Sequence, residues 1–385
     1  MGMAREVGPS RVGRMGKLTG KGVMHGLGTL MSLALLAGCS GGSSAPSDEP
    51  VGSNASAIGT SADVVFDVSV RGTGTSTIHA HVFDNPAHRG FVNVLAVHGL
   101  VNTGFVYGPL AQAIFADQAL GSVVRRVLAI DLPGHGDSTF PENLPGGATF
   151  GDLLIEDNAG VVLQSIDALR HKGLPTPIVF GHSMGGLAIQ TAQQQLLAAG
   201  SSLASHGVVG AVLLAPVPPH GEPWTVPPTG NLGPFLVTDP VLGTYLQIPA
   251  AAFVPLAFTT TTGQVATNAP TPDQVTAGRY LGPEPISTLS ELVEATVALP
   301  DGGSFTPQRP TVERGAFAPR HRTVLSLVSF SEDTLVPAAD LGPLYEYLTG
   351  DSRDRLYREV TAPDAVHEML VSDPAPIVDA IRPML

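Results

Sequence analysis

The sequence has 385 residues, 43% of them hydrophobic and 14% charged, which is enough for one large globular domain or two modest ones. Its formal net charge is −13 and its body holds no basic run, which argues against a nucleic-acid partner, because phosphate binding needs clustered lysines and arginines. The single cysteine, Cys39, excludes a disulfide within the chain.

Residues 1–38 have the layout of an export signal. Five basic residues and one acid precede the apolar run Leu27–Ala37, which is too short for a membrane span of about 20 residues. The run ends in LAGC, which resembles the lipobox of bacterial lipoproteins. That resemblance implies cleavage before Cys39, lipidation of this cysteine, and a lipid anchor to a membrane of the cell envelope, facing the periplasm or the exterior. An ordinary signal peptide with an incidental cysteine is the alternative.

The next residues, 39–61, are rich in Gly, Ser and Pro and show no apolar periodicity, a composition typical of a flexible tether. Apolar and polar side chains then alternate over residues 62–70 and 77–83, with RGTGTS between them. This pattern predicts an antiparallel hairpin. The folded domain is therefore expected over residues 62–385.

Short, nearly continuous apolar runs follow at residues 92–97, 123–130, 177–180, 208–215 and 323–330. Such runs are typical of strands that are buried on both faces of a sheet. Helical patterns lie between them at residues 108–120, 150–170 and 187–199, and a short strand at 355–360 and a helix near 377–384 end the chain. Alternating strands and helices with right-handed crossovers predict an α/β fold with a mostly parallel, doubly wound sheet.

Residues from about 216 to 320 interrupt this alternation. The segment is rich in Pro, Thr and Ala, and it is too long for a loop in a compact domain. Its clearest helical patterns cover residues 241–253, 272–281 and 286–299. We therefore expect a helical cap inserted between two strands of the sheet.

Ser183 stands between glycines in GHSMGG, where an apolar strand pattern meets a helical one. The pattern G-x-S-x-G carries weight only in such a context, because Ser40 in the tether also matches it. A sharp turn there strains the backbone, and the glycines let strand and helix approach, so that the hydroxyl is accessible. The helix start directs backbone N–H groups toward an oxyanion. Ser183 is the candidate nucleophile; an ordinary tight turn is the alternative.

A serine nucleophile needs a base and a group that orients the base. Asp333 directly follows the strand expected at 323–330, at the end of the sheet where open parallel sheets place their sites. His367 follows the last expected strand, and the order Ser, Asp, His is known for this triad. Glu332 adjoins Asp333 and stays open as the acid. His321 is a rival base, although it precedes a strand instead of following one.

Acyl transfer also needs two N–H donors for the oxyanion. Met184 follows the nucleophile and offers one backbone donor, and the loop after the strand at 92–97 offers the amide of Leu100. A simple glycine turn is the alternative reading of that loop. The chemistry requires no cofactor, and the spacing of the 12 histidines indicates no metal cluster.

Five motifs in this order resemble the α/β-hydrolase fold superfamily, in its capped esterase and lipase branch: VHGL (97–100), DLPGHGDS (131–138), GHSMGG (181–186), EDTLVP (332–337) and VHEML (366–370). The resemblance covers about residues 62–385 and implies a serine hydrolase that cleaves carboxylic esters through an acyl-enzyme. The acid loop departs from the family pattern, because SFSED lacks the glycine often found before the carboxylate.

The fold alone does not fix the reaction. Dehalogenases and epoxide hydrolases of this superfamily use Asp at the elbow, so Ser183 argues against both. C–C bond hydrolases, peptidases and cofactor-free haloperoxidases stay open, as does a non-catalytic lipid-anchored binding protein. The apolar run at 250–258 either faces an acyl or aromatic substrate or packs on the sheet. The expected partners are a small-molecule or lipid ester and, through Cys39, a membrane.

Overall fold

The computed structural model describes residues 61–87, 90–225, 232–294, 297–298, 304–305, 307–350 and 356–385. The expected export signal, Cys39 and all of the expected tether but Ser61 lie outside the described residues. Within the part of the chain that is described, no helix has both the length and the apolar character needed to cross a membrane.

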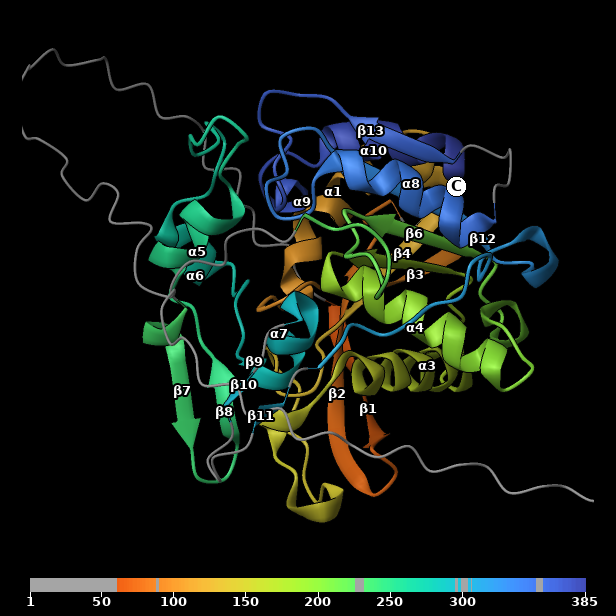
Figure 1. The fold of residues 1–385 in the computed structure, drawn as a ribbon. Helices are drawn as coiled ribbons and strands as arrows, with labels where there is room; N and C mark the ends of the chain where they lie inside the picture. The colour runs from red at the N-terminus through yellow and green to blue at the C-terminus, as the bar shows by residue number, and fades with distance from the viewer. Residues whose placement is uncertain are drawn as a thin grey trace, which may run out of the picture. The chain divides into compact units, whose positions relative to one another are not determined.

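An eight-stranded sheet in the order β1-β2-β4-β3-β5-β6-β12-β13 organises the domain (Figure 1). Its strands are β1 (Ser61–Val70), β2 (Gly74–Asp84), β3 (Val92–Val97), β4 (Val124–Ile130), β5 (Ile178–His182), β6 (Gly210–Leu214), β12 (Val324–Phe330) and β13 (Tyr357–Val360). The pairs from β4 to β13 are parallel, while β1–β2 and β2–β4 are antiparallel. The predicted α/β fold with a mostly parallel, doubly wound sheet is confirmed, and so is the hairpin.

Helices lie on both sides of this sheet, α3 and α4 on one side and α1, α8 and α10 on the other (Figure 1). The helices are α1 (Tyr107–Ala116), α2 (Leu120–Val123), α3 (Ile155–His171), α4 (Met184–Ala198), α8 (Ala338–Thr349), α9 (Met369–Ser372) and α10 (Ala375–Ile381). The sequence analysis missed α8, because Gly342 and Pro343 interrupt its helical pattern. The helix tolerates them at that position, with Leu341 and Leu344 buried against the sheet.

The residues between β6 and β12 differ from the expected purely helical cap; we call residues 216–320 the inserted segment. Its helices are α5 (Ala250–Ala257), α6 (Pro272–Ala277) and α7 (Ile286–Val293), and its strands are β7 (Leu236–Asp239), β8 (Gly243–Leu246), β9 (Glu284–Pro285), β10 (Val297–Ala298) and β11 (Ser304–Phe305). The helix expected at 241–253 is wrong in its first half. There Gly243, at φ 78°, turns the chain into β8, and α5 begins only after Pro249. The helices expected at 272–281 and 286–299 are present but shorter.

The inserted segment has an apolar cluster of its own. Phe253, Val254 and Phe258 from α5 and its end pack there with Leu289 from α7. The cluster also contains Val101 and Val366, which lie in loops after β3 and β13. The inserted segment therefore packs at the carboxyl ends of the parallel strands, where open sheets place their sites.

Candidate active site

Ser183 occupies the turn from β5 to α4 with φ 52° and ψ −121°, a conformation that is strained for a residue with a side chain. The glycines around it make this turn possible. A Cβ at Gly185 would lie 2.3 Å from the carbonyl oxygen of Val97, and one at Gly181 would lie 2.7 Å from that of Gly185. The strand and the helix therefore approach in the way that the sequence predicted for a nucleophile turn.

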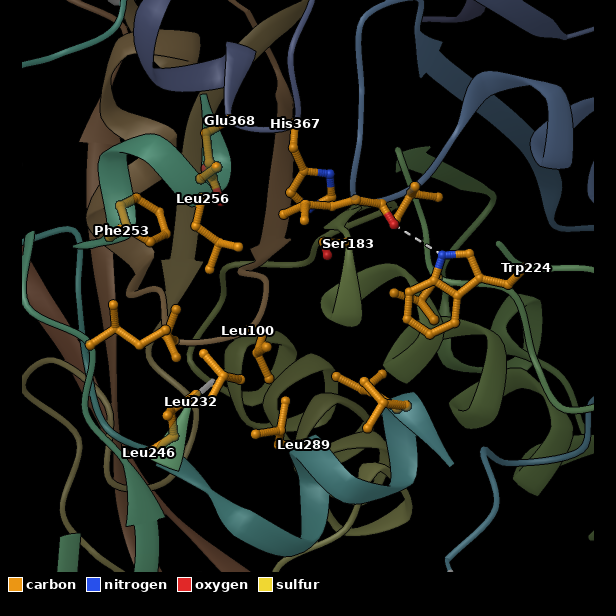
Figure 2. Close-up of a pocket in the computed structure, with 18 residues that line it drawn as sticks. Leu100, Ser183, Trp224, Leu232, Leu246, Phe253, Leu256, Leu289, His367 and Glu368 are labelled. Atoms are coloured by element: carbon orange, nitrogen blue, oxygen red, sulfur yellow. Dashed lines mark hydrogen bonds between the residues drawn. The ribbon is translucent and has the colours of Figure 1, made fainter. Parts of the chain in front are cut away.

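Asp333 and His367 form a buried pair next to this turn. The ring N–H at Nδ1 of His367 donates to Oδ2 of Asp333 at 2.8 Å. The other carboxylate oxygen, Oδ1, accepts from the backbone N–H groups of Leu335 and Val336, both at 2.8 Å. Because both oxygens are held, the carboxylate fixes the ring of His367, which lies beside Ser183 on the wall of one cavity (Figure 2).

The two rival residues lie elsewhere. Glu332 accepts hydrogen bonds from the backbone N–H and the hydroxyl of Thr261, so its carboxylate faces the inserted segment. His321 ends a short 3₁₀ turn before β12, at the opposite end of that strand from Asp333. Of the two adjacent acids, Asp333 is therefore the one that the fold pairs with a histidine.

The environment of His367 fits the base that the sequence analysis expects at this position. Burial alone would lower the pKa of the imidazole, but the negative charge of Asp333 and their hydrogen bond outweigh burial and raise the pKa of His367 above its usual value. A base with a raised pKa holds an abstracted proton more firmly, which suits transfer from a serine hydroxyl.

The two candidate oxyanion donors lie next to Ser183, the candidate nucleophile. Met184 is the first residue of α4, so its backbone N–H is one of those without a partner inside the helix. Leu100 lines the same cavity as Ser183. The preceding Gly99 packs so closely that a Cβ there would lie 3.0 Å from the Cβ of Ser183. The loop after β3 therefore passes directly beside the serine.

An apolar cavity lies in front of these groups (Figure 2). The inserted segment supplies much of its lining: Val217, Trp224, Leu232, Leu246, Ile248, Phe253, Leu256, Ala257, Leu289, Leu292 and Val293. The indole N–H of Trp224 donates to the carbonyl oxygen of Leu335 at 3.0 Å, which joins this wall to the acid loop. Within the apolar run at 250–258, Leu256 lines the cavity, whereas Phe258 is buried in the apolar cluster of the inserted segment and not against the sheet.

Glu368 is a polar wall residue that the sequence analysis missed. Its Oε1 accepts from the side-chain amide of Asn102 at 2.6 Å and lies 3.9 Å from Nδ1 of His182. Burial raises the pKa of the Glu368 carboxyl. Its partners are distant in sequence, so a signal within a few residues of Glu368 could not have found it.

Two groups of side chains among the described residues bring potential metal-ligand atoms close together. Ligand atoms of His182, His367 and Glu368 lie within 4.8 Å of one another, and so do those of Asp63, His81 and Asp137. In the first group His182 donates through Nε2 to the carbonyl oxygen of His367, whose Nδ1 donates to the carboxylate of Asp333. We assign no metal to either group.

Comparison with solved structures found similar proteins. An esterase from Thermogutta terrifontis is 16% identical, with a TM-score of 0.47 over 84% of this chain and 98% of that one. An esterase from Rhodococcus sp. ECU1013 is 17% identical, with a TM-score of 0.48 over 83% and 98%. The N-acyl homoserine lactonase AidH is 15% identical, with a TM-score of 0.47 over 84% and 96%. No curated protein sequence matches the chain.

The sequence model of the alpha/beta hydrolase family matches residues 94–380. The match begins within β3 and ends within α10, so it contains the turn at Ser183, the acid loop and the histidine loop. Because this match covers most of the folded domain, the chain belongs to the alpha/beta hydrolase family.

Proposed function

We propose that the protein is a serine hydrolase that cleaves carboxylic esters. The observation that carries the proposal is the buried Asp333–His367 pair beside Ser183, whose backbone is held in a strained turn. Family membership supports a hydrolase. The proposal adds that the bond it cleaves is a carboxylic ester.

In the proposed reaction the hydroxyl of Ser183 attacks the ester carbonyl while His367 takes its proton through Nε2. Asp333 orients the ring and stabilises its charged form. The backbone N–H groups of Leu100 and Met184 stabilise the oxyanion. His367 then returns the proton to the leaving alcohol, and water attacks the acyl-enzyme by the same route.

The substrate's acyl or aromatic part would lie against the apolar wall, with the inserted segment acting as a cap. Leu256 and Leu289 from this segment face the cavity that Ser183 also lines (Figure 2). An apolar wall with a few polar groups at one end favours an uncharged, hydrophobic substrate over a charged one.

Hydrolysis of p-nitrophenyl esters with acyl chains of two to sixteen carbons tests the proposal. We expect the wild type to be active and Ser183→Ala to lose at least about 10⁴-fold in kcat. Covalent labelling by an active-site phosphonate should occur in the wild type and be absent in the variant. Ester hydrolysis that survives Ser183→Ala would contradict the assignment of the nucleophile, and labelling without hydrolysis of any ester would exclude the ester bond.

We also propose that the mature protein is lipid-anchored through Cys39 to a membrane of the cell envelope. The LAGC motif after a cationic head and a short apolar run supports this. Cys39→Ser should yield a soluble or unprocessed form. Fractionation would contradict the proposal if the variant and the wild type associated equally with membranes.

A further inference from the structure

The loop after β3 is fastened to the inserted segment by backbone hydrogen bonds. The N–H of Gly282 donates to the carbonyl oxygen of Val101 at 2.7 Å, and the N–H of Thr103 donates to that of Tyr280 at 3.0 Å. Val101 itself has φ 55°. Such a conformation is unfavourable for a β-branched residue and persists where its surroundings hold it.

A buried carboxylate completes this attachment. Oε2 of Glu284, in β9, accepts from the backbone N–H of Val101 at 2.8 Å and lies 3.2 Å from Nε2 of His135. The side chain of Glu284 is fully buried. A carboxylate that is buried and hydrogen-bonded to two groups is a rigid support, because moving it would leave those groups unpaired.

The ring of His135, which contacts Glu284, has a second partner on its other side. Nδ1 of His135 contacts the carbonyl oxygen of Pro133 at 3.1 Å, so both ring nitrogens face acceptors. Burial alone would lower the pKa of His135, but the hydrogen bond and the negative charge of Glu284 raise it. The pair therefore links the inserted segment, the loop after β4 and the loop after β3 in one buried network.

We propose that Glu284 is a positioning residue that holds the loop after β3 so that the amide of Leu100 faces the reacting carbonyl oxygen. This inference rests on the proposed function. The hydrogen bond from the N–H of Val101 to Glu284 fixes the peptide plane between Leu100 and Val101. This restricts the adjoining peptide plane, which carries the N–H of Leu100, a residue that lines the cavity. An oxyanion donor works only at about 2.7–3.1 Å, so even a small displacement of this loop slows the reaction.

The test compares two disruptive variants with one conservative variant. Glu284→Met removes the acceptor and keeps most of the volume, Glu284→Ala removes both, and Glu284→Gln keeps an oxygen that can accept from Val101. We expect Met and Ala to lower kcat by about 10- to 100-fold with little change in KM, since loss of a whole oxyanion donor costs about 10²- to 10³-fold. The affinity of these two variants for a boronic acid that forms a tetrahedral adduct with the serine should fall by the same factor. Glu284→Gln should keep most of the wild-type kcat and most of the wild-type affinity.

Glu291→Ala is the matched control. Glu291 is also a buried acidic side chain of the inserted segment, but its Oε2 accepts at 2.8 Å from the backbone N–H of Ile155, at the start of α3 and away from the loop after β3. Its removal should change kcat by less than about threefold. Hydrogen exchange of the peptide over residues 99–104 supplies a readout without substrate. It should speed up in Glu284→Met and not in Glu291→Ala.

The outcomes separate this inference from the proposed function. Equal loss of kcat in the Glu284 and Glu291 variants, or faster exchange with unchanged kcat, would overturn the positioning role. If the wild type neither hydrolyses esters nor reacts with the phosphonate, the proposed function fails. The exchange experiment then decides by itself whether Glu284 holds the loop, and unchanged exchange in Glu284→Met would overturn that as well.

Discussion

The body of the domain and the inserted segment build the same cavity in different ways. In the body, the side chains of the proposed triad lie in the turns and loops after β5, β12 and β13, and Asp333 is held by amides two and three residues away. In the inserted segment, Glu284 and Glu291 accept from amides 183 and 136 residues away. The proposed chemistry is therefore encoded in local turns, while the cavity wall and its supports depend on long-range contacts.

Asp333→Asn tests the local half of this comparison and should have the largest effect. The amide cannot stabilise a protonated His367 or hold its tautomer, so we expect kcat to fall by about 10³- to 10⁴-fold. Glu332→Gln, one residue earlier and directed at Thr261, should change kcat by less than about threefold. Steady-state kinetics on a short-chain ester measure both. A larger loss in the Glu332 variant would reverse the assignment of the acid.

The pH dependence of the wild type tests the charge environment of the same loops. His367 must be neutral to accept a proton, and Asp333 raises the pKa of His367 above 6.5. We therefore expect kcat/KM to fall about tenfold per pH unit once the pH is below this raised pKa. A profile from pH 5 to 9 measures the midpoint. An acid limb centred below pH 6.5 would show that burial outweighs the carboxylate.

Leu256→Ala tests the long-range half of the comparison. Leu256 lines the cavity from α5 and lies outside the proposed triad. We expect kcat/KM for octanoyl esters to fall by about tenfold, because apolar contact with the longer chain is lost, and that for acetyl esters to change little. Val241→Ala, at an exposed position of the inserted segment, is the control. An equal loss on both esters would indicate a general disturbance of the site.

Glu291→Gln should have the smallest effect, on stability alone. Burial and the neighbouring Glu156 raise the pKa of Glu291 to about 9 in the folded protein. The contribution of the protonated Glu291 to the free energy of unfolding is therefore fully present below pH 4.5, and it is lost as the pH rises toward 9. The amide keeps the hydrogen-bonding shape without ionising. We expect a gain on the order of 1 kcal/mol at pH 8 and none near pH 4.5, measured by denaturant unfolding. A gain that does not change with pH would contradict it.

The sequence predicted the local features well and the long-range features poorly. Ser183 was identifiable because a strand, glycines and a helix stand together in a few residues, and the sheet because its strands are apolar runs. The choice between Asp333 and Glu332 depended on which of the two carboxylates accepts hydrogen bonds from Thr261. The positions of two adjacent residues in the sequence cannot reveal this. Glu284 carried no local signal, because its hydrogen bond to Val101 is made only in the folded chain.

The place where the inserted segment joins the sheet has an evolutionary consequence. It leaves after β6 and returns at β12, and these two strands are hydrogen-bonded neighbours in parallel register. Exchange of the whole segment by recombination would keep that register while it replaced the apolar wall. A segment without an acceptor for the amide of Val101 would then bring a new substrate range together with slower turnover. Lineages that exchange this module are expected to regain such an acceptor as they adapt.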